Sequence, residues 1–337
     1  NRYANIVLDL EGGVGDRVTE TRVWAQDMFT LVGYRASRGW TNHIVYYAIR
    51  FDRPMKEFVL NNDDVNSHYA QVIFDVNPGT VIQVQVGISP VSEAGALANL
   101  QAEQYKKDFA QLKSEAKERW NNELGRIRAQ FDSPRDSVIF YTSLYHVLFA
   151  PQVWNDVTGD YMGANGMLKR NADFQNYTTW SLWDTYRTLH PLLALIDRER
   201  SLDFAKTSLD IYKQSGFLPM WELASFETYC MIGMHGISMM ADLYTKGIIA
   251  DKDLTLTSML GSMDKKKFGF NFFVENGFIS SEKEHESVSK TVEYAYNAYC
   301  VAKIAQLQNK PEIYSSMISK AQYYKNLFNP NNTFIQP

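Results

Sequence analysis

Hydrophobic and polar positions in residues 1–92 follow the short period of β-strands. The runs 44–51 and 71–76 are rich in β-branched and aromatic residues, and 80–88 alternates apolar and polar positions with a period of two. Turn residues such as Asn77-Pro78-Gly79 separate these runs. Because several short strands follow one another without an intervening helix, the pattern predicts an antiparallel β-sandwich over residues 1–92.

The pattern changes to a helical one after Pro90. Residues 93–130 are rich in Ala, Leu, Gln, Glu and Lys, and their apolar residues recur at helical spacing, as in Leu97, Leu100, Phe109, Leu112, Ala116, Trp120 and Leu124. This segment is therefore predicted to form one or two amphipathic helices that link two domains.

Residues 131–337 keep a helical period. The predicted helices cover 136–150, 182–197, 201–215, 228–246, 288–307 and 311–327. Some connections are short, whereas 159–166 and 216–222 are longer, without helical period, and contain Gly and aromatic residues. Antiparallel helices joined alternately by short and long loops predict helical hairpins arranged in a toroid, with the long loops forming a site at one end.

Composition and charge limit the partners. Hydrophobic residues at 45% and charged residues at 21% are typical of a globular protein. A net charge of −4 without a recurring Lys/Arg cluster argues against nucleic acid. No run of ~18 apolar residues predicts a membrane span. Cys230 and Cys300 lie in hydrophobic, helical contexts and are expected to be buried free thiols. The sequence begins without Met and stops after a turn cluster, so we expect an internal fragment of a longer chain.

The segment 177–190 combines large aromatic residues with an acid, a base and an imidazole: Tyr177, Trp180, Trp183, Asp184, Tyr186, Arg187 and His190. Aromatic residues three positions apart drift by about 60° per step around a helix, so they cannot all face one core. Trp and Tyr offer a flat apolar face and a hydrogen-bonding edge, which suit a sugar ring. We therefore expect Trp183 or Asp184 to face a ligand.

Two structural alternatives exist for Asp184. Ser181 and Asp184 have the spacing of a capping box, which would place Asp184 in the first turn of a helix that begins near Leu182. Asp184 and Arg187 could also form an ordinary i,i+3 ion pair, worth roughly 0.2–0.5 kcal/mol.

Glu293 lies at the edge of a predicted apolar stripe made of Val288, Val292, Ala295, Tyr299 and Ala302. Its neighbours Tyr294 and Tyr296 would desolvate the carboxyl and raise its pKa, as a general acid requires. The alternative is an ion pair with Lys290 on a solvated face, and spacing alone favours this alternative.

Three motifs together resemble glycoside hydrolase family 92, the calcium-dependent exo-acting α-mannosidases. They are Trp-Ser-Leu-Trp-Asp within 177–193, Gly-Phe-Leu-Pro-Met-Trp with Glu-Thr-Tyr-Cys-Met-Ile-Gly-Met-His within 216–247, and Val-Glu-Tyr-Ala-Tyr within 286–296. Weaker similarity upstream extends the resemblance over nearly the whole chain. The sequence departs from the family where acidic residues are common, at Met234, Asn297 and Ala298, and these departures concern fine substrate contacts.

The resemblance implies a multidomain β + α architecture. It comprises part of an N-terminal β-sandwich over 1–92, a helical linker over 93–130 and part of an (α/α)6 barrel over 131–337. It also implies an exo-acting α-mannosidase that removes terminal α-linked mannose with inversion, through α-1,2 or related linkages of N-glycans or mannans. The family further implies a secreted, periplasmic or cell-surface location.

The resemblance also implies roles for individual residues. Glu293 aligns with the general acid, and Trp183 and Asp184 align with residues of the terminal-mannose subsite. Trp221 and Glu227, from the second motif, are expected to bind substrate in the same cleft.

The family's general base and most of its calcium ligands lie in C-terminal segments unlike any in this sequence. We expect calcium in the full enzyme and no metal ligand among these residues. The imidazoles show no ligand spacing and are interpreted as structural or cleft residues, namely His146, His190, His235 and His285.

Two other classes of function are open on the sequence. A non-catalytic carbohydrate-binding protein on the same scaffold would not need Glu293. Another (α/α)-toroid enzyme, such as a polysaccharide lyase, would need a Tyr/His pair and basic residues for uronate carboxylates, and the acidic charge balance argues mildly against it.

Overall fold

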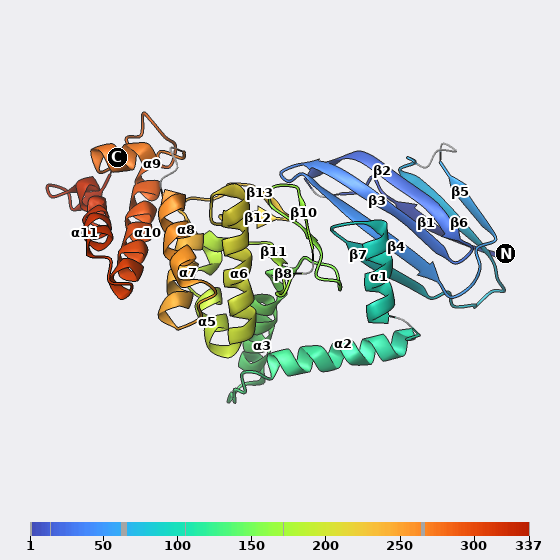
Figure 1. Cartoon of the computed structure of the whole chain (residues 1–337). Helices are drawn as coiled ribbons and strands as arrows, with labels where there is room; N and C mark the ends of the chain where they lie inside the picture. Colours follow the sequence, from blue (N-terminus) through green and yellow to red (C-terminus); the bar gives the residue numbers. More distant parts are fainter. Residues whose placement is uncertain are drawn as a thin grey trace. The chain divides into compact units, whose positions relative to one another are not determined.

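The computed structural model describes residues 2–13, 15–61, 66–104, 106–170, 172–263 and 267–336 (Figure 1). The chain divides into two compact units, the first made of 1–178 with 224–226 and the second of 179–223 with 227–337. The division into two units does not test the domain boundaries predicted at residues 92 and 130, which stay predictions. Within the described ranges, no helix has the length and apolar character needed to cross a bilayer.

Two antiparallel sheets form the N-terminal part of the first unit. One sheet has the order β1-β6-β5, from Tyr3–Asp9, Tyr69–Asp75 and Glu57–Leu60. The other has the order β2-β3-β4-β7, from Asp16–Asp27, Thr30–Gly39, His43–Phe51 and Val84–Ser89. The antiparallel β region predicted for 1–92 is therefore confirmed, although the strand predicted over 80–88 begins only at Val84.

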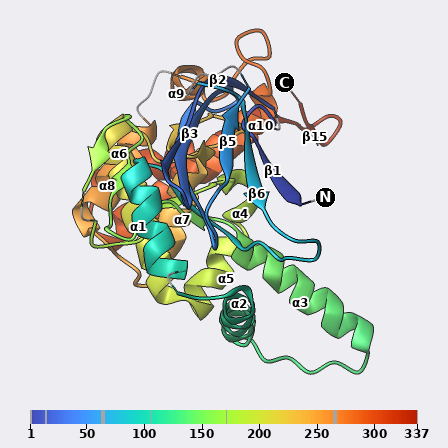
Figure 2. The same cartoon turned by 90° about the vertical axis from the view of Figure 1, so that its right-hand side faces the viewer.

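The two sheets share one apolar core (Figure 2). Val23, Leu31 and Phe51 of the four-stranded sheet pack in one cluster with Val72 and Phe74 of the three-stranded sheet. Alternate residues of β4 and β6 point into this cluster, as the period of two requires.

Helix α1 (Glu93–Gln104) covers the other face of the four-stranded sheet, where Ala96 and Leu100 pack against Val32 and Ala48. The approach is so close that a Cβ on Gly87 of β7 would lie 2.4 Å from the Ala96 carbonyl oxygen, so only glycine fits there.

The linker continues as α2 (Phe109–Leu124) and α3 (Pro134–Phe149). Asp108 and Gln111 form a reciprocal capping box at the start of α2. The rings of Trp120 and Tyr145 join the two helices with centroids 4.5 Å apart. Short strands complete the unit: β8 (Gln152–Val153), β9 (Tyr161–Met162), β10 (Leu168–Lys169) and β11 (Tyr177–Thr178).

The second unit is mainly helical. Its helices are α4 (Leu182–Thr185), α5 (Leu189–Ile196), α6 (Arg198–Ser215), α7 (His235–Thr245), α8 (Lys252–Met263), α9 (Phe270–Asn276), α10 (Ser287–Leu307), α11 (Pro311–Lys320) and the 3-10 helix η1 (Tyr323–Leu327). Short strands are β12 (Glu222–Leu223), β13 (Phe226–Glu227), β14 (Phe328–Asn329) and β15 (Phe334–Ile335). Helices α7, α8, α9 and α11 all pack against α10 (Figure 1).

Three predicted helices differ from the structure, and the one predicted over 311–327 ends at Lys320 and is followed by η1. The helix predicted over 182–197 is split into α4 and α5, because Pro191 inside a continuous helix would lack an N–H group and clash with the preceding turn. The helix predicted over 228–246 begins at His235, since Tyr229, Met231 and Gly233 have φ values of 53°, 68° and 81°. Cys230 therefore lies in a half-buried loop and not in a helix, while Cys300 is buried as expected.

Helix α8 was not predicted, because its buried residues are largely polar. The hydroxyls of Thr255, Ser258 and Ser262 donate to backbone carbonyls one turn earlier, so they lie in the core without an apolar pattern.

The apolar stripe predicted for α10 is wrong in part, since only its residues Ala295 and Ala302 are buried. Val292 and Tyr299 are exposed, and the buried face runs through Thr291, Tyr294 and Ala298 instead. Small and hydroxyl-bearing side chains occupy this face because α10 packs closely against several helices.

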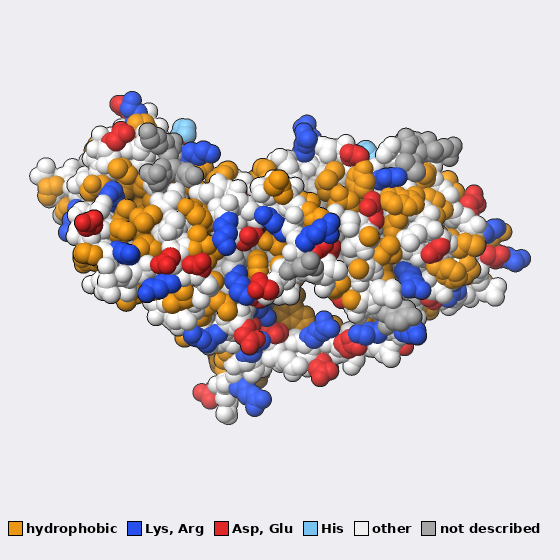
Figure 3. Space-filling model, viewed as in Figure 1, with side chains coloured by type: hydrophobic (Ala, Val, Ile, Leu, Met, Phe, Trp, Pro, Cys, Tyr) orange, Lys and Arg blue, Asp and Glu red, His pale blue; other side chains and the backbone are white. Residues whose placement is uncertain are grey.

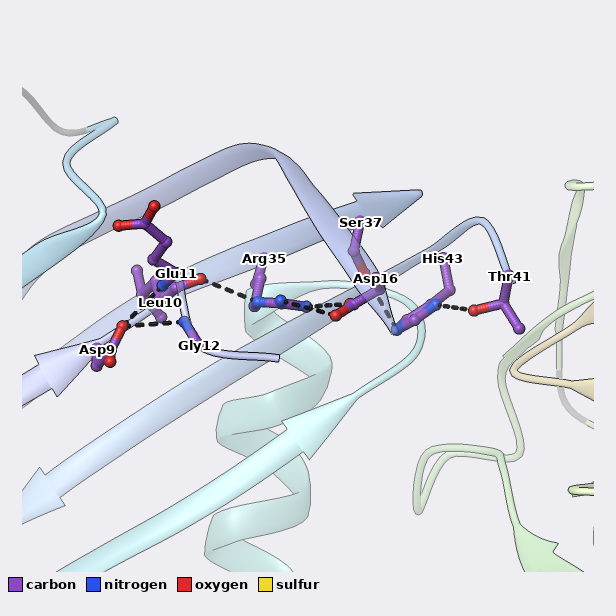
Figure 4. A network of polar contacts seen from close by, with 9 residues as sticks. All are labelled: Asp9, Leu10, Glu11, Gly12, Asp16, Arg35, Ser37, Thr41 and His43. Carbon is purple, nitrogen blue, oxygen red and sulfur yellow. Dashed lines mark hydrogen bonds and ion pairs between the residues drawn. The ribbon is translucent and has the colours of Figure 1, made fainter. Parts of the chain in front are cut away.

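A polar cluster ties the start of the chain to the four-stranded sheet (Figure 4). Arg35 of β3 donates to the Leu10 carbonyl over 2.9 Å and forms a 2.8 Å ion pair with Asp16. The pKa of Asp16 is lowered, chiefly by its hydrogen bond from Arg35. His43 lies beside this pair and bonds to Thr41 over 2.8 Å. The cluster thus fixes the connection between β1 and β2.

We expect Asp16→Ala to destabilise the first unit, because it leaves the guanidinium of Arg35 without its carboxylate. A lost charged hydrogen bond of this kind costs about 1–3 kcal/mol. Amide protection in β2 and β3, measured by hydrogen exchange, should fall by roughly ten- to hundredfold.

The sign of the pH dependence follows from the lowered pKa of Asp16. Its stabilisation is present at neutral pH and is lost as pH falls through the folded-state pKa, so the variant and the parent protein should converge in acid. Asp75→Ala, which removes an exposed ion pair with Arg2, is the matched control and should change little. Equal protection in all three proteins would contradict this role for Asp16.

Candidate active site

The aromatic residues of 177–190 divide into core and site residues, as their drift around the helix predicts. Trp180 is fully buried between His190 and Phe204, with ring centroids 5.8 and 5.3 Å away. Burial lowers the pKa of His190 to about 3, so this imidazole is a neutral core residue. Trp183 and Tyr186, by contrast, are half-buried.

Trp183 and Glu293 meet, although they are far apart in the sequence. The indole Nε1 of Trp183, in α4, donates to Glu293 Oε1 of α10 over 3.3 Å. The other carboxylate oxygen lies 3.0 Å from Nε2 of His235, the first residue of α7. The His235 side chain is only 1% exposed and that of Glu293 16% exposed. Three separate elements thus converge on one carboxyl group.

The contact between His235 and Glu293 is at ion-pair distance, but it is not a linear hydrogen bond. The contact is attractive, because a buried imidazole nitrogen is more stable when it shares a proton with a carboxylate oxygen 3.0 Å away than when it has no partner.

The environment lowers the pKa of Glu293, which corrects the expected rise. Burial acts to raise the pKa, but the contacts with His235 and Trp183 and the positive charge of Arg187 outweigh it. The aromatic neighbours therefore matter less than the N–H groups that face the carboxylate. Lys290, the alternative partner, is paired instead with Glu284 over 2.7 Å and Glu286 over 3.6 Å.

Tyr186 and Arg187 complete the wall of the site. The Tyr186 ring lies parallel to the imidazole of His235, with centroids 3.9 Å apart. The guanidinium of Arg187 lies over the rings of Tyr186 and Trp183, at 4.7 and 5.5 Å. Arg187 thus contacts these rings and does not form the ion pair considered with Asp184.

Asp184 lies next to Trp183 on α4 and is exposed to solvent. Its carboxylate accepts a hydrogen bond from the Ser181 hydroxyl. The helix begins at Leu182 as expected, but the Ser181 side chain does not cap a backbone N–H group. The capping-box alternative is therefore wrong, and the Asp184 side chain faces water beside the indole.

Trp221 and Glu227 form a second group. The Glu227 carboxylate accepts hydrogen bonds from the backbone N–H groups of Met220, Trp221 and Tyr229, each over 2.9 Å. Burial raises the pKa of Glu227, and these three bonds oppose the rise. Glu227 thus holds the loop that presents the half-buried Trp221.

Sequence reasoning missed the roles of His235, Tyr186 and Arg187 at this carboxyl. Each residue occurs within a motif, but contacts between separate helices leave no fixed spacing in a sequence. Across the ranges that the structure describes, no three His, Cys, Asp or Glu side chains are grouped so that they could hold a metal ion.

The arrangement can do two things chemically. A partly buried carboxyl between an indole and an imidazole can exchange a proton with a bound molecule. Half-buried Trp and Tyr rings beside the exposed Asp184 can bind the C–H face and the hydroxyls of a sugar. On the face drawn in Figure 3, basic side chains are interspersed with acidic ones.

Residues 95–337 match the Glycosyl hydrolase family 92 catalytic domain. A fungal relative, an uncharacterized secreted glycosidase of Arthroderma benhamiae, is 23% identical over 287 residues, which cover 79% of this chain and 33% of the relative.

Two solved structures from Bacteroides thetaiotaomicron are similar over nearly all of this chain. One is a family GH92 alpha-mannosidase in complex with mannoimidazole, 30% identical, with a TM-score of 0.93 over 99% of this chain and 47% of that one. The other is a family GH92 inverting mannosidase, 26% identical, with a TM-score of 0.87 over 98% of this chain and 47% of that one. The chain thus spans about half the length of these structures.

We expect Glu227→Gln to loosen the loop that carries Trp221. The amide nitrogen of glutamine faces a backbone N–H group that it cannot accept from, and the charge that strengthens the other two bonds is lost. The cost is about 1–3 kcal/mol. Hydrogen-exchange protection of the amides of Met220, Trp221 and Tyr229 should fall by roughly ten- to hundredfold. Glu275→Gln, at an exposed position of α9, is the control, and unchanged protection in Glu227→Gln would refute this role.

Proposed function

The chain belongs to glycosyl hydrolase family 92, and we propose that the protein is an exo-acting α-mannosidase that hydrolyses terminal α-linked mannose with inversion. The substrates are mannose-containing glycans such as N-glycans or mannans, cleaved at α-1,2 or related linkages. The observation that carries the proposal is the partly buried Glu293 carboxyl between Trp183 and His235.

Glu293 acts in this proposal as the general acid. It protonates the glycosidic oxygen while a water molecule attacks the opposite face of the sugar. Inversion requires a second carboxylate roughly 6.5–9.5 Å away to activate that water. We propose that this base lies outside the present sequence.

The lowered pKa of Glu293 bears on when it is protonated. A sugar bound over the carboxyl removes its remaining water, and desolvation favours the neutral form. The carboxylate therefore takes up a proton and becomes a neutral acid as the substrate enters, and its pKa in the complex lies above that in the free protein.

The neighbouring residues bind the terminal mannose. The Trp183 ring stacks on the sugar through the face opposite Arg187, and the exposed Asp184 accepts hydrogen bonds from hydroxyl groups. Trp221 borders the same subsite, and Glu227 contributes by holding the Trp221 loop.

Further properties of the whole enzyme follow from the family resemblance. We expect the helical unit to form part of an (α/α)6 toroid, and the protein to be secreted, periplasmic or on the cell surface. We also expect the enzyme to need calcium. No set of described residues fits a calcium site, so none of them is assigned as a ligand.

One observation favours a second function. The indole N–H group and the imidazole nitrogen that face Glu293 suit a carboxylate that accepts hydrogen bonds from sugar hydroxyls in a non-catalytic carbohydrate-binding protein. The two functions are distinguished by how strongly the loss of activity in a Glu293 variant depends on the leaving group of the substrate.

We expect Glu293→Gln in the full-length protein to lose far more activity on a mannose disaccharide than on an aryl mannoside with a good leaving group. Glutamine keeps size and hydrogen bonding but cannot supply the proton that a poor leaving group needs. The two losses should differ by about 10²-fold or more, the usual scale for a positioned acid.

Asp184→Asn is the matched variant and should weaken both substrates alike, since a subsite contact does not depend on the leaving group. Equal losses for Glu293→Gln on both substrates would mean that Glu293 orients the sugar and that the acid lies elsewhere.

A further inference from the structure

A chain of buried polar side chains lies behind Glu293. Nδ1 of His235 is 3.0 Å from the hydroxyl of Ser238, and Nδ2 of Asn297 donates to the same hydroxyl oxygen over 3.0 Å. Asn297 in turn accepts from the backbone N–H group of Met234 over 2.8 Å. His235, Ser238 and Asn297 are all buried, so water does not compete for these bonds.

The direction of each bond can be worked out from this chain. A backbone N–H group can only donate, so the atom of Asn297 that faces Met234 is its carbonyl oxygen. The amide NH2 group of Asn297 therefore donates to Ser238. The Ser238 oxygen is then already an acceptor, and its own hydrogen must point to another partner.

Two acceptors compete for the Ser238 hydroxyl hydrogen. One is the thiol of Cys300, whose pKa is raised to about 11 by burial, so that it is a neutral sulfur and a weak acceptor. The other is Nδ1 of His235, a strong acceptor when it carries no proton. A hydroxyl hydrogen directed at Nδ1 places the imidazole proton on Nε2, which lies 3.0 Å from Oε2 of Glu293. The opposite tautomer, with Nδ1–H donating to the second lone pair of Ser238, would set the lone pair of Nε2 against the carboxylate oxygen.

We propose that His235 is a positioning residue, held by Ser238 and Asn297 in the neutral Nε2–H tautomer, which presents this N–H group to Oε2 of Glu293. The proposal rests on the function proposed above for Glu293. Tyr186 fixes the plane of the imidazole by stacking parallel to it.

The tautomer decides where the catalytic proton can lie. Because Nε2 already carries a proton, His235 cannot accept one from Glu293, and Oε2 stays an acceptor. Oε1 also accepts, from the Trp183 indole, but over the longer distance of 3.3 Å against 3.0 Å at Oε2, so Oε1 is the oxygen on which the proton of the acid is added more easily. His235 thus orients the carboxyl so that one defined oxygen faces the sugar.

The charged groups around this pair are few. Glu293, on α10, faces His235 of α7. It also faces Tyr186 and Arg187, which follow α4 in the sequence. On α10 itself, Tyr296 lies near both rings, and Lys290 is paired with Glu284 and Glu286. Asp242 of α7 acts on Cys300 and Tyr296. Among the described residues, Arg187 supplies a positive charge that acts on the Glu293 carboxyl.

The tautomer is tested directly by ¹⁵N NMR on the whole chain labelled in its 6 histidines. The His235 signals are identified as those lost in His235→Gln. We expect the pattern of a neutral Nε2–H imidazole in the parent protein and a change of this pattern in Ser238→Ala. An imidazolium or an Nδ1–H tautomer in the parent protein overturns the proposal.

The effect on the acid is tested by the pH profile of kcat/KM for mannoside hydrolysis in the full-length enzyme. Activity falls as pH rises through the pKa of a general acid. His235→Met removes the N–H group that stabilises the carboxylate, so the basic limb should move up by roughly one pH unit, with kcat falling more than KM changes. His235→Gln keeps an N–H donor and should restore the limb toward that of the parent.

Equal basic limbs in His235→Met and His235→Gln would overturn the positioning role. A failure of the proposed function is distinguishable from this outcome. If Glu293 were not the acid, Glu293→Gln would lose activity equally on both mannosides, while the tautomer of His235 in the resting protein would still be as inferred. The NMR measurement on the parent protein also tests the proposal if His235→Met does not fold.

Discussion

The hydrogen-bonding surroundings of the Glu293 carboxylate are the constraint on which the site depends. The two oxygens of this carboxylate, on α10, contact an indole N–H group from α4 and an imidazole from the first turn of α7. In this structure α4 ends after one turn and α7 begins at His235, which brings both groups to the carboxylate. The break before Pro191 and the left-handed residues at 229, 231 and 233 are therefore part of how the site is built.

Much of the fold was predictable from the sequence because its signals are local. The change from a period of two to a helical period near residue 90, and helices α3, α6 and α10, follow from the order of apolar residues. Helix α8 was not predictable in this way, since Thr255, Ser258 and Ser262 are buried through hydrogen bonds to their own backbone. Apolar periodicity detects burial by the hydrophobic effect and not burial by satisfied polar groups.

The candidate site was predictable only in part. Trp183 and Glu293 were found through motifs, and the structure places them in contact. His235 was not assigned to Glu293, because a contact between two helices has no spacing in the sequence. The direction of the Glu293 pKa shift was wrong for the same reason: adjacent tyrosines are visible in the sequence, but the N–H groups that face the carboxylate are not. The role of Glu227 was not predictable for the same reason, since its three backbone partners lie in a loop without a regular sequence pattern.

The central claim is that Glu293 is held as a carboxylate by N–H donors until a sugar binds. The most direct measurement is the pKa of this one carboxyl in the sugar-free protein, from a ¹³C NMR titration of protein labelled at the glutamate carboxyl carbon. Comparison with Glu293→Gln identifies its signal. The account predicts a value below that of an ordinary glutamate, about 4.3. A value at or above the ordinary one would contradict it, because the indole and the imidazole would then not stabilise the charge.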